Sequence, residues 1–183
     1  MTNTNFLQYS DLEGYLFKVV STHYAQSKTL TAFDFFCIVI WKANRAKSKV
    51  AERLLAHGSG QANLGAAVGS LLAAISGAKD QRARLSVLIE GWGFRLPMAS
   101  AILTVLYPED FTVYDIRVCE ILRDFKDAQY KTNFATLWER YSAYLIAVKA
   151  TAPESLSLRD KDRFLWGKSF ATQLQTDIQS SFG

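Results

Sequence analysis

The sequence contains few of the residues that build metal clusters, disulfide frameworks or sharp turns. Among its 183 residues are only two cysteines, two histidines and three prolines. Two cysteines exclude a four-cysteine zinc site and a four-cysteine iron–sulfur cluster. Cys37 and Cys119 each lie in an apolar helical pattern, so we expect reduced core thiols and a cytoplasmic protein. Neither His23 nor His57 has metal-ligand spacing to a partner, so we expect no catalytic histidine and no metal site.

Long hydrophobic runs are also missing. Residues 62–75 form the most apolar stretch, but Asn63, Ser70 and two glycines interrupt it, and it is too short to cross a bilayer of about 30 Å. Residues 1–9 are polar and lack the basic-then-apolar layout of a secretory signal. We therefore expect no signal peptide and no membrane partner.

What the sequence does contain is helical periodicity along nearly its whole length, and no segment alternates as a strand should. No repeat or linker divides the chain, so we predict a single compact all-α domain over residues 1–183. Three pairs of a Ser or Thr followed by an acidic residue predict capped helix starts. They are Ser10 with Glu13, Thr31 with Asp34, and Ser157 with Asp160.

The net charge of +4 comes entirely from the first half of the chain, because residues 1–90 hold ten Lys and Arg against six Asp and Glu. Much of this excess lies in one segment: Lys42, Arg45, Lys47, Lys49 and Arg53. A basic face attracts phosphate backbones, and we name Lys42, Arg45 and Lys47 as candidate DNA contacts. A solvated helix surface is the alternative interpretation.

A short turn, Gly91-Trp92-Gly93, separates two apolar helical segments. Two glycines allow positive φ and leave backbone N–H groups uncovered at the start of the second helix, where the helix dipole favours an anion. The turn could therefore hold one DNA phosphate, or it could be a plain helix–helix connection. Trp92 either lies exposed beside the DNA backbone or anchors the turn in the core.

Asp115 precedes a good helical run, Ile116 to Leu122. Asp is a favoured N-cap residue, which accounts for its presence without any function. An ionised carboxylate at a helix N-terminus is also what a reaction with a cationic transition state requires. Arg117 lies at the same helix start, where the dipole disfavours a positive charge. It either holds a phosphate or carboxylate or faces solvent.

Together these segments resemble the helix-hairpin-helix DNA glycosylase superfamily, with Ile89-Glu90-Gly91-Trp92-Gly93 as the hairpin and Tyr114-Asp115-Ile116-Arg117-Val118 as the catalytic segment. The resemblance covers residues 80–125, and less specifically Asp162–Lys168. It implies an all-helical, two-lobed bundle around a cleft, with the motif at about residues 80–106. Glu90 departs from the usual proline, and the segment after Gly93 is slightly longer than usual.

The resemblance implies a monofunctional glycosylase, because Arg95 falls near the position of the lysine nucleophile and arginine forms no Schiff base. Such an enzyme flips a damaged or modified base out of duplex DNA and hydrolyses its N-glycosidic bond. Asp115 would stabilise the sugar cation and orient water. The other candidate site residues are Gly91, Trp92, Gly93, Arg95 and Arg117 for DNA, and Trp41, Tyr114, Trp166 and Lys168 for the base pocket.

No cofactor is expected, although the resemblance allows an alkali cation that bridges hairpin carbonyls to a phosphate. We expect a monomer. Candidate substrates include alkylated, oxidised and deaminated bases and the hypermodified bases of bacteriophage DNA. Two other functions compete with this one. The first is a non-catalytic helix-hairpin-helix DNA-binding protein, and the second is a structural or regulatory helical protein with no nucleic-acid partner.

Overall fold

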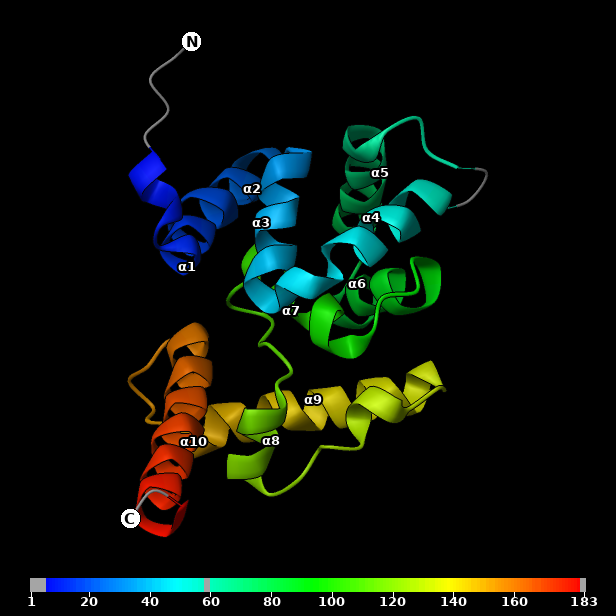
Figure 1. Ribbon diagram of the computed structural model, residues 1–183. Coiled ribbons are helices and arrows are strands. Elements are labelled where there is room, and N and C mark those ends of the chain that lie inside the picture. The colour runs from blue at the N-terminus through cyan, green and yellow to red at the C-terminus, as the bar shows by residue number, and fades with distance from the viewer. Residues whose placement is uncertain (1–5, 58–59, 182–183) are drawn as a thin grey trace. The chain divides into compact units, whose positions relative to one another are not determined.

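The structure is a computed structural model that describes residues 6–57 and 60–181 (Figure 1). Helices make up its regular structure, and none of these described residues lies in a β-strand. The prediction of an all-α fold is therefore confirmed. The chain forms two compact units, which we call unit 1, ending at Tyr107, and unit 2, starting at Pro108.

Unit 1 is built around α7, whose residues from Met98 to Leu106 are all buried. Within α7 the hydroxyl of Thr104 donates to the carbonyl of Ser100 at 2.7 Å, so this polar side chain is satisfied inside the core. The α-helices of the unit are α1 Leu12–Tyr15, α2 Ser21–Ser27, α3 Ala32–Ala43, α4 Lys47–Ala56, α5 Leu64–Gly77, α6 Gln81–Ser86 and α7 Leu96–Leu106. Short 3-10 turns cover Phe6–Tyr9 and Asn44–Ala46, and π-helical turns cover Leu16–Val20 and Val87–Gly91.

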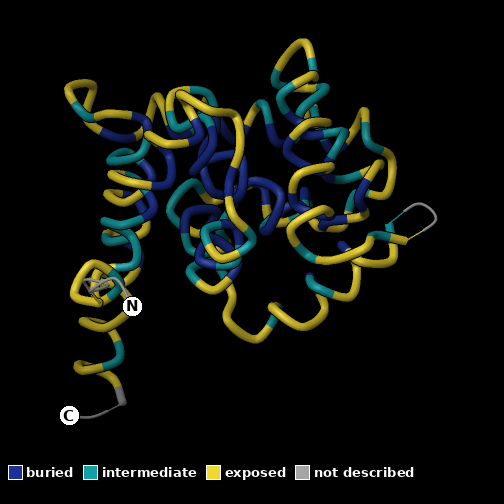
Figure 2. The backbone as a smooth tube through the Cα atoms, turned by 90° about the horizontal axis from the view of Figure 1, so that it is seen from above, coloured by how far each residue is buried: buried dark blue, intermediate teal, exposed yellow. Residues whose placement is uncertain are grey.

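Unit 2 packs its helices around buried aromatic residues, of which Tyr114, Tyr141 and Tyr144 are the largest. Its elements are α8 Ile116–Leu122, a 3-10 turn at Ala128–Tyr130, α9 Phe134–Thr151 and α10 Leu158–Ser181. Buried stretches of the chain are drawn dark blue in Figure 2. Residues 171–180 of α10, towards the C label in Figure 2, are exposed or of intermediate exposure.

Polar caps define several helix starts. The hydroxyl of Thr31 accepts from the N–H of Asp34 at 3.1 Å, so this predicted cap is confirmed. Ser157 likewise accepts from the N–H of Asp160 at 3.1 Å. The predicted cap at Ser10 is wrong, because Asp11 carries out that role and accepts from the N–H of Gly14. Further side-chain caps are Asn63, Asp80, Asp115 and Asn133.

Both cysteines are free and buried, as their apolar surroundings predicted. Burial raises the pKa of the Cys37 thiol above its usual value and that of Cys119 to about 11. In the part of the chain that the structure covers, no helix has the length and apolar character needed to span a bilayer. The same residues contain no group of three or more His, Cys, Asp or Glu side chains arranged to hold a metal ion.

Candidate functional site

The Gly-x-Gly turn joins two helical segments, as predicted. Residues 81–91 form the first segment, and Trp92–Arg95 connect it to α7. Gly93 has a φ of +65°, in the left-handed region that favours glycine. The N–H of Phe94 donates to the carbonyl of Leu88 at 2.8 Å, which closes the π-helical end of the first segment. The conformation of Gly93 thus ends one helix and redirects the chain into the next.

Arg53 of α4 and His57, the residue that follows α4, hold this turn in place. The guanidinium of Arg53 donates to the carbonyl of Gly93 and lies 5.8 Å from the centre of the Phe94 ring. One helical turn further on, the ring of His57 stacks on Trp92, with centroids 3.6 Å apart and planes 12° from parallel. Trp92 is only 5% exposed. Of the two alternatives for Trp92, the structure therefore supports the anchor in the core, and its role as a surface DNA contact is corrected.

The backbone of the turn, in contrast, is open. Gly91, Gly93 and Arg95 are exposed, and a Cβ added to either glycine would meet no atom within 4 Å. The N–H groups of Gly93 and Arg95 donate no hydrogen bond within the described residues. These N–H groups precede α7, whose N-terminus has no side-chain cap. The Gly93 carbonyl, where the resemblance would allow an alkali cation, already accepts from Arg53.

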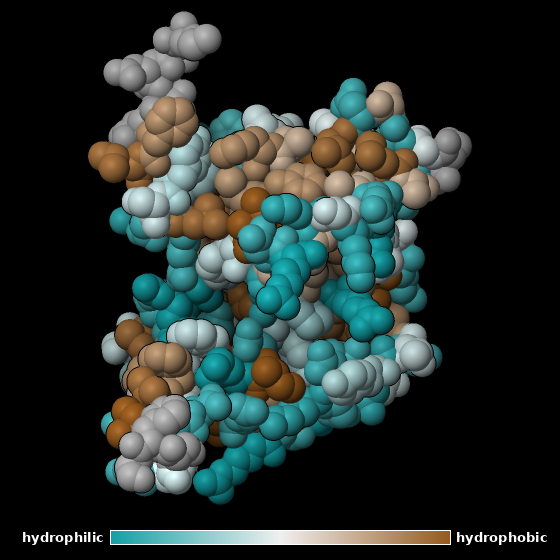
Figure 3. All heavy atoms as spheres, in the orientation of Figure 1, coloured by the Kyte–Doolittle hydropathy of each residue, from teal (hydrophilic) through white to brown (hydrophobic). Residues whose placement is uncertain are grey.

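The predicted basic contacts lie where α3 passes into α4. Lys42 is in the last turn of α3, Arg45 is exposed in the connection that follows, and Lys47 is exposed at the start of α4. Lys47 makes one long hydrogen bond, of 3.4 Å, to the side chain of Asn44. In Figure 3 hydrophilic side chains cover this connection in the middle of the view. Lys47 begins α4, the helix that also supplies Arg53, and His57 follows directly after that helix.

Asp115 caps the N-terminus of α8. Its backbone is extended, and its Oδ1 accepts from the N–H of Arg117 at 3.0 Å. The residue is neither buried nor fully exposed. The capping interpretation of Asp115 is therefore confirmed, and the carboxylate is also within reach of solvent.

Two tyrosines of α9 fix the extended segment that leads to Asp115. The hydroxyl of Tyr141 donates to the carbonyl of Thr112 at 2.7 Å and accepts from the N–H of the same residue at 3.3 Å. The hydroxyl of Tyr144 donates to the carbonyl of Val113 at 2.8 Å and accepts from the N–H of Asp115 at 3.4 Å. Burial raises the pKa of both tyrosines well above the usual value, so both hydroxyls stay protonated.

Arg117 turns from α8 towards α10 instead of facing solvent alone. Its guanidinium donates to the side-chain oxygen of Gln173 at 2.9 Å and lies 5.6 Å from the centre of the Trp166 ring. Trp166 also stacks on Phe170, with centroids 5.8 Å apart. Trp166 is 43% exposed, so it is available on the surface of unit 2. Lys168 is exposed on another side of α10.

The other two candidates for the base pocket lie in different units. Trp41, in unit 1, is partly buried and meets Phe17 edge-on. Tyr114, in unit 2, is 1% exposed, and its hydroxyl donates to the carbonyl of Phe125 at 2.7 Å. Tyr114 therefore belongs to the core of unit 2, which corrects its prediction as a pocket wall. An aromatic residue such as Tyr114, directly before the N-cap Asp115, indicates core packing as readily as it indicates a binding pocket.

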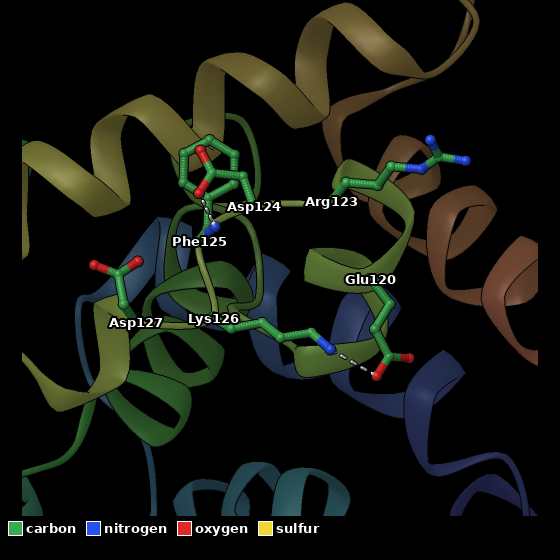
Figure 4. Close-up of a pocket in the computed structure, with 6 residues that line it drawn as sticks. All are labelled: Glu120, Arg123, Asp124, Phe125, Lys126 and Asp127. Atoms are coloured by element: carbon green, nitrogen blue, oxygen red, sulfur yellow. Dashed lines mark hydrogen bonds and ion pairs between the residues drawn. The ribbon is translucent and has the colours of Figure 1, made fainter.

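A hollow of about 440 Å³ opens where α8 ends (Figure 4). Its acidic side chains are already paired, because Arg140 binds Asp124 at 2.6 Å and Asp127 at 2.7 Å. Lys126 binds Glu120 at 3.2 Å. The bond from Arg140 lowers the pKa of Asp124, and bonds from Lys131 and Arg140 lower the pKa of Asp127. The hollow is thus a self-neutralised ion-pair network.

Comparisons with protein families, with curated proteins and with solved structures found no match. The interpretation of the site therefore depends on its own geometry. Sequence reasoning missed two sets of residues that fix the candidate site: Arg53 with His57, and Tyr141 with Tyr144. Each pair has helical spacing, i and i+4 or i and i+3, which indicates a shared face but not its partner.

Proposed function

We propose that the chain is a monofunctional DNA glycosylase similar to the helix-hairpin-helix superfamily. The observation that carries the proposal is the Asp115 carboxylate, which caps α8, stays within reach of solvent and follows a braced extended segment. The open N–H groups of Gly93 and Arg95 support it as a grip for one backbone phosphate. This grip reads no base sequence and serves to position the duplex.

The chemistry follows from the charge of Asp115. As the bond between the sugar C1′ and the base nitrogen breaks, positive charge develops on the deoxyribose. The carboxylate stabilises that charge and accepts a proton from the water whose oxygen bonds to C1′, while the base leaves with its electron pair and takes a proton from solvent. Arg95 supplies no amine nucleophile, so the product is an intact strand with an abasic site.

The test is incubation with duplexes that carry alkylated, oxidised, deaminated or hypermodified bases, followed by alkali, which cleaves at abasic sites. We expect cleavage only after alkali. Asp115→Asn should keep the cap, since Asn caps as well as Asp, and should keep DNA binding. It should lower the rate of base release by about 10²-fold or more, because the amide lacks the charge and the basicity.

Asp80→Asn is the matched control, because Asp80 caps α6 by accepting from the N–H of Ala83 at 2.7 Å. This variant makes the same chemical change at another helix start and should retain full base release. Equal activity of the Asp115 and Asp80 variants would exclude Asp115 as the catalytic residue.

The second candidate is a DNA-binding protein without catalysis. It is favoured by one observation, namely that the bond from Asp115 to the N–H of Arg117 is a sufficient structural role for the carboxylate. Tight DNA binding with no abasic sites on any of the substrates would support this candidate over the glycosylase.

A further inference from the structure

A second pocket in unit 2, of about 480 Å³, lies between the end of α8 and α10. Arg123 and Glu120 line it from the α8 side, and Lys168, Ser169 and Thr172 line it from α10. In Figure 4 the Arg123 side chain points away from Asp124 and towards α10, so its charge is directed out of the ion-pair network. The two hollows therefore differ in electrostatic character.

The cations of this pocket are not neutralised by the protein. Within the described residues, Arg123 and Lys168 form no ion pair and no side-chain hydrogen bond. The carboxylate of Glu120, which also lines the pocket, is bound to Lys126 at 3.2 Å. Two free positive charges thus face a pocket whose only carboxylate is already occupied.

The neutral groups of the pocket are also donors. Ser169 is only 5% exposed, and neither its hydroxyl nor that of Thr172 has a hydrogen-bond partner in the described part of the chain. The side-chain oxygen of Gln173 accepts from Arg117 at 2.9 Å, which leaves the amide N–H₂ group to donate. The hydroxyls of Ser169 and Thr172, beside two cations, suit a ligand that accepts several hydrogen bonds.

The end of α8 counters this preference only in part, because two of its last carbonyl oxygens are already occupied. A helix C-terminus presents carbonyl oxygens, which repel anions when they are free. Here the carbonyl of Glu120 accepts from the N–H of Arg123, and the carbonyl of Cys119 accepts from the N–H of Asp124, each at 3.3 Å. Arg123, with a φ of +56°, ends the helix and carries its guanidinium into the pocket rim.

We propose that this pocket binds a phosphate group. An arginine fork, an ammonium and hydroxyl donors match the three or more acceptor oxygens of a phosphate. The inference that its ligand is a DNA backbone phosphate rests on the proposed function. Asp115 and Arg123 stand at opposite ends of α8, about 12 Å apart along the axis, so both could face one strand.

The first experiment uses inorganic phosphate and the intact chain. Saturable shifts of the Ser169 and Thr172 amide resonances are expected in the wild type and should be lost in the Arg123→Ala/Lys168→Ala double variant. Lys131→Ala is the matched control, because Lys131 pairs with Asp127 at 2.9 Å and lies outside the pocket. Shifts that persist in the double variant, or none in the wild type, would overturn the phosphate site.

The second experiment measures duplex binding at several salt concentrations. Loss of one phosphate contact should reduce the slope of log affinity against log salt by about 0.9 in the double variant, with no change in the Lys131 control. An unchanged slope would overturn the DNA role of the pocket and leave the glycosylase proposal standing. Phosphate binding without any DNA binding would keep the site and reject the glycosylase.

Discussion

The glycine turn of unit 1 and the Asp115 segment of unit 2 are fixed in opposite ways. At the turn, His57 holds the ring of Trp92 and Arg53 holds the carbonyl of Gly93, while backbone N–H groups remain open. Before Asp115, tyrosine hydroxyls take the backbone groups, and the side chain is left within reach of solvent. One region offers its backbone and the other offers a carboxylate.

This contrast fits the two tasks that we assign. A site for a backbone phosphate needs several N–H donors that bind it whatever the base sequence, and exposed backbone supplies such donors. A reacting carboxylate needs a fixed position, and a segment with satisfied backbone groups provides one. Substitutions in either the glycine turn or the Asp115 segment can alter that region alone and so test this comparison.

The largest effect should follow Tyr144→Phe. It removes the hydroxyl between Val113 and Asp115 and leaves a buried carbonyl without its donor, which should lower the free energy of unfolding by about 1–3 kcal/mol. Base release should fall more than DNA affinity, because the carboxylate loses its brace. Urea unfolding and single-turnover kinetics would measure the two effects.

Tyr24→Phe is the control for this prediction, since Tyr24 is equally buried and its hydroxyl bonds that of Tyr107 at 2.9 Å. It should lower stability without a specific loss of base release. The same kinetic loss in both tyrosine variants would mean that stability, not the position of Asp115, controls the rate.

A smaller effect should follow Gly93→Ala. A methyl group at a φ of +65° costs about 1–2 kcal/mol, and relief of that strain should disturb the turn and weaken duplex binding. Gly91→Ala makes the same change two residues earlier, at a φ outside the left-handed region, and should be neutral or slightly stabilising. Fluorescence anisotropy with a duplex compares the two. Equal losses of affinity would show that added bulk, and not backbone conformation, matters.

The smallest effect concerns acid. A bond from Arg140 holds the pKa of Asp124 below the usual value of 3.8, and bonds from Lys131 and Arg140 do the same for Asp127. The stability that these carboxylates contribute is therefore complete above pH 3.8 and is lost as the pH falls through their lowered pKa values. Arg140→Met should therefore reduce the urea midpoint at neutral pH and narrow the gap between neutral and acidic midpoints. Both carboxylates are exposed, so the change should be small. If the difference between the neutral and acidic urea midpoints equals that of the wild type, the bonds from Arg140 to Asp124 and Asp127 do not contribute to stability.

Local patterns predicted the helices well, because a cap such as Thr31 acts within a few residues. The exception at Ser10 is instructive, since the neighbouring Asp11 is an equally good cap and the spacing alone does not choose between them. Residues 158–181 form one continuous helix across Gly167, because a single glycine weakens a helix without ending it.

The parts of the site that the sequence did not predict all depend on distant pairs. Arg53 lies forty residues before Gly93, and Tyr144 lies twenty-nine after Asp115. Periodicity shows that such residues share a helix face, but tertiary packing decides what that face meets. Tyr114 failed for the same reason, since its burial by Phe125 and α9 is invisible in the local pattern.

The burial of Cys37 and Cys119 has a practical consequence. Thiol reagents attack the thiolate, and both native thiols are shielded and held in the protonated form at neutral pH. A cysteine introduced at exposed Ser48, in the basic first turn of α4, would thus be the preferred attachment point for a maleimide dye. A dye at this position would test the proposed binding of duplex DNA, and the two native cysteines would not have to be replaced first.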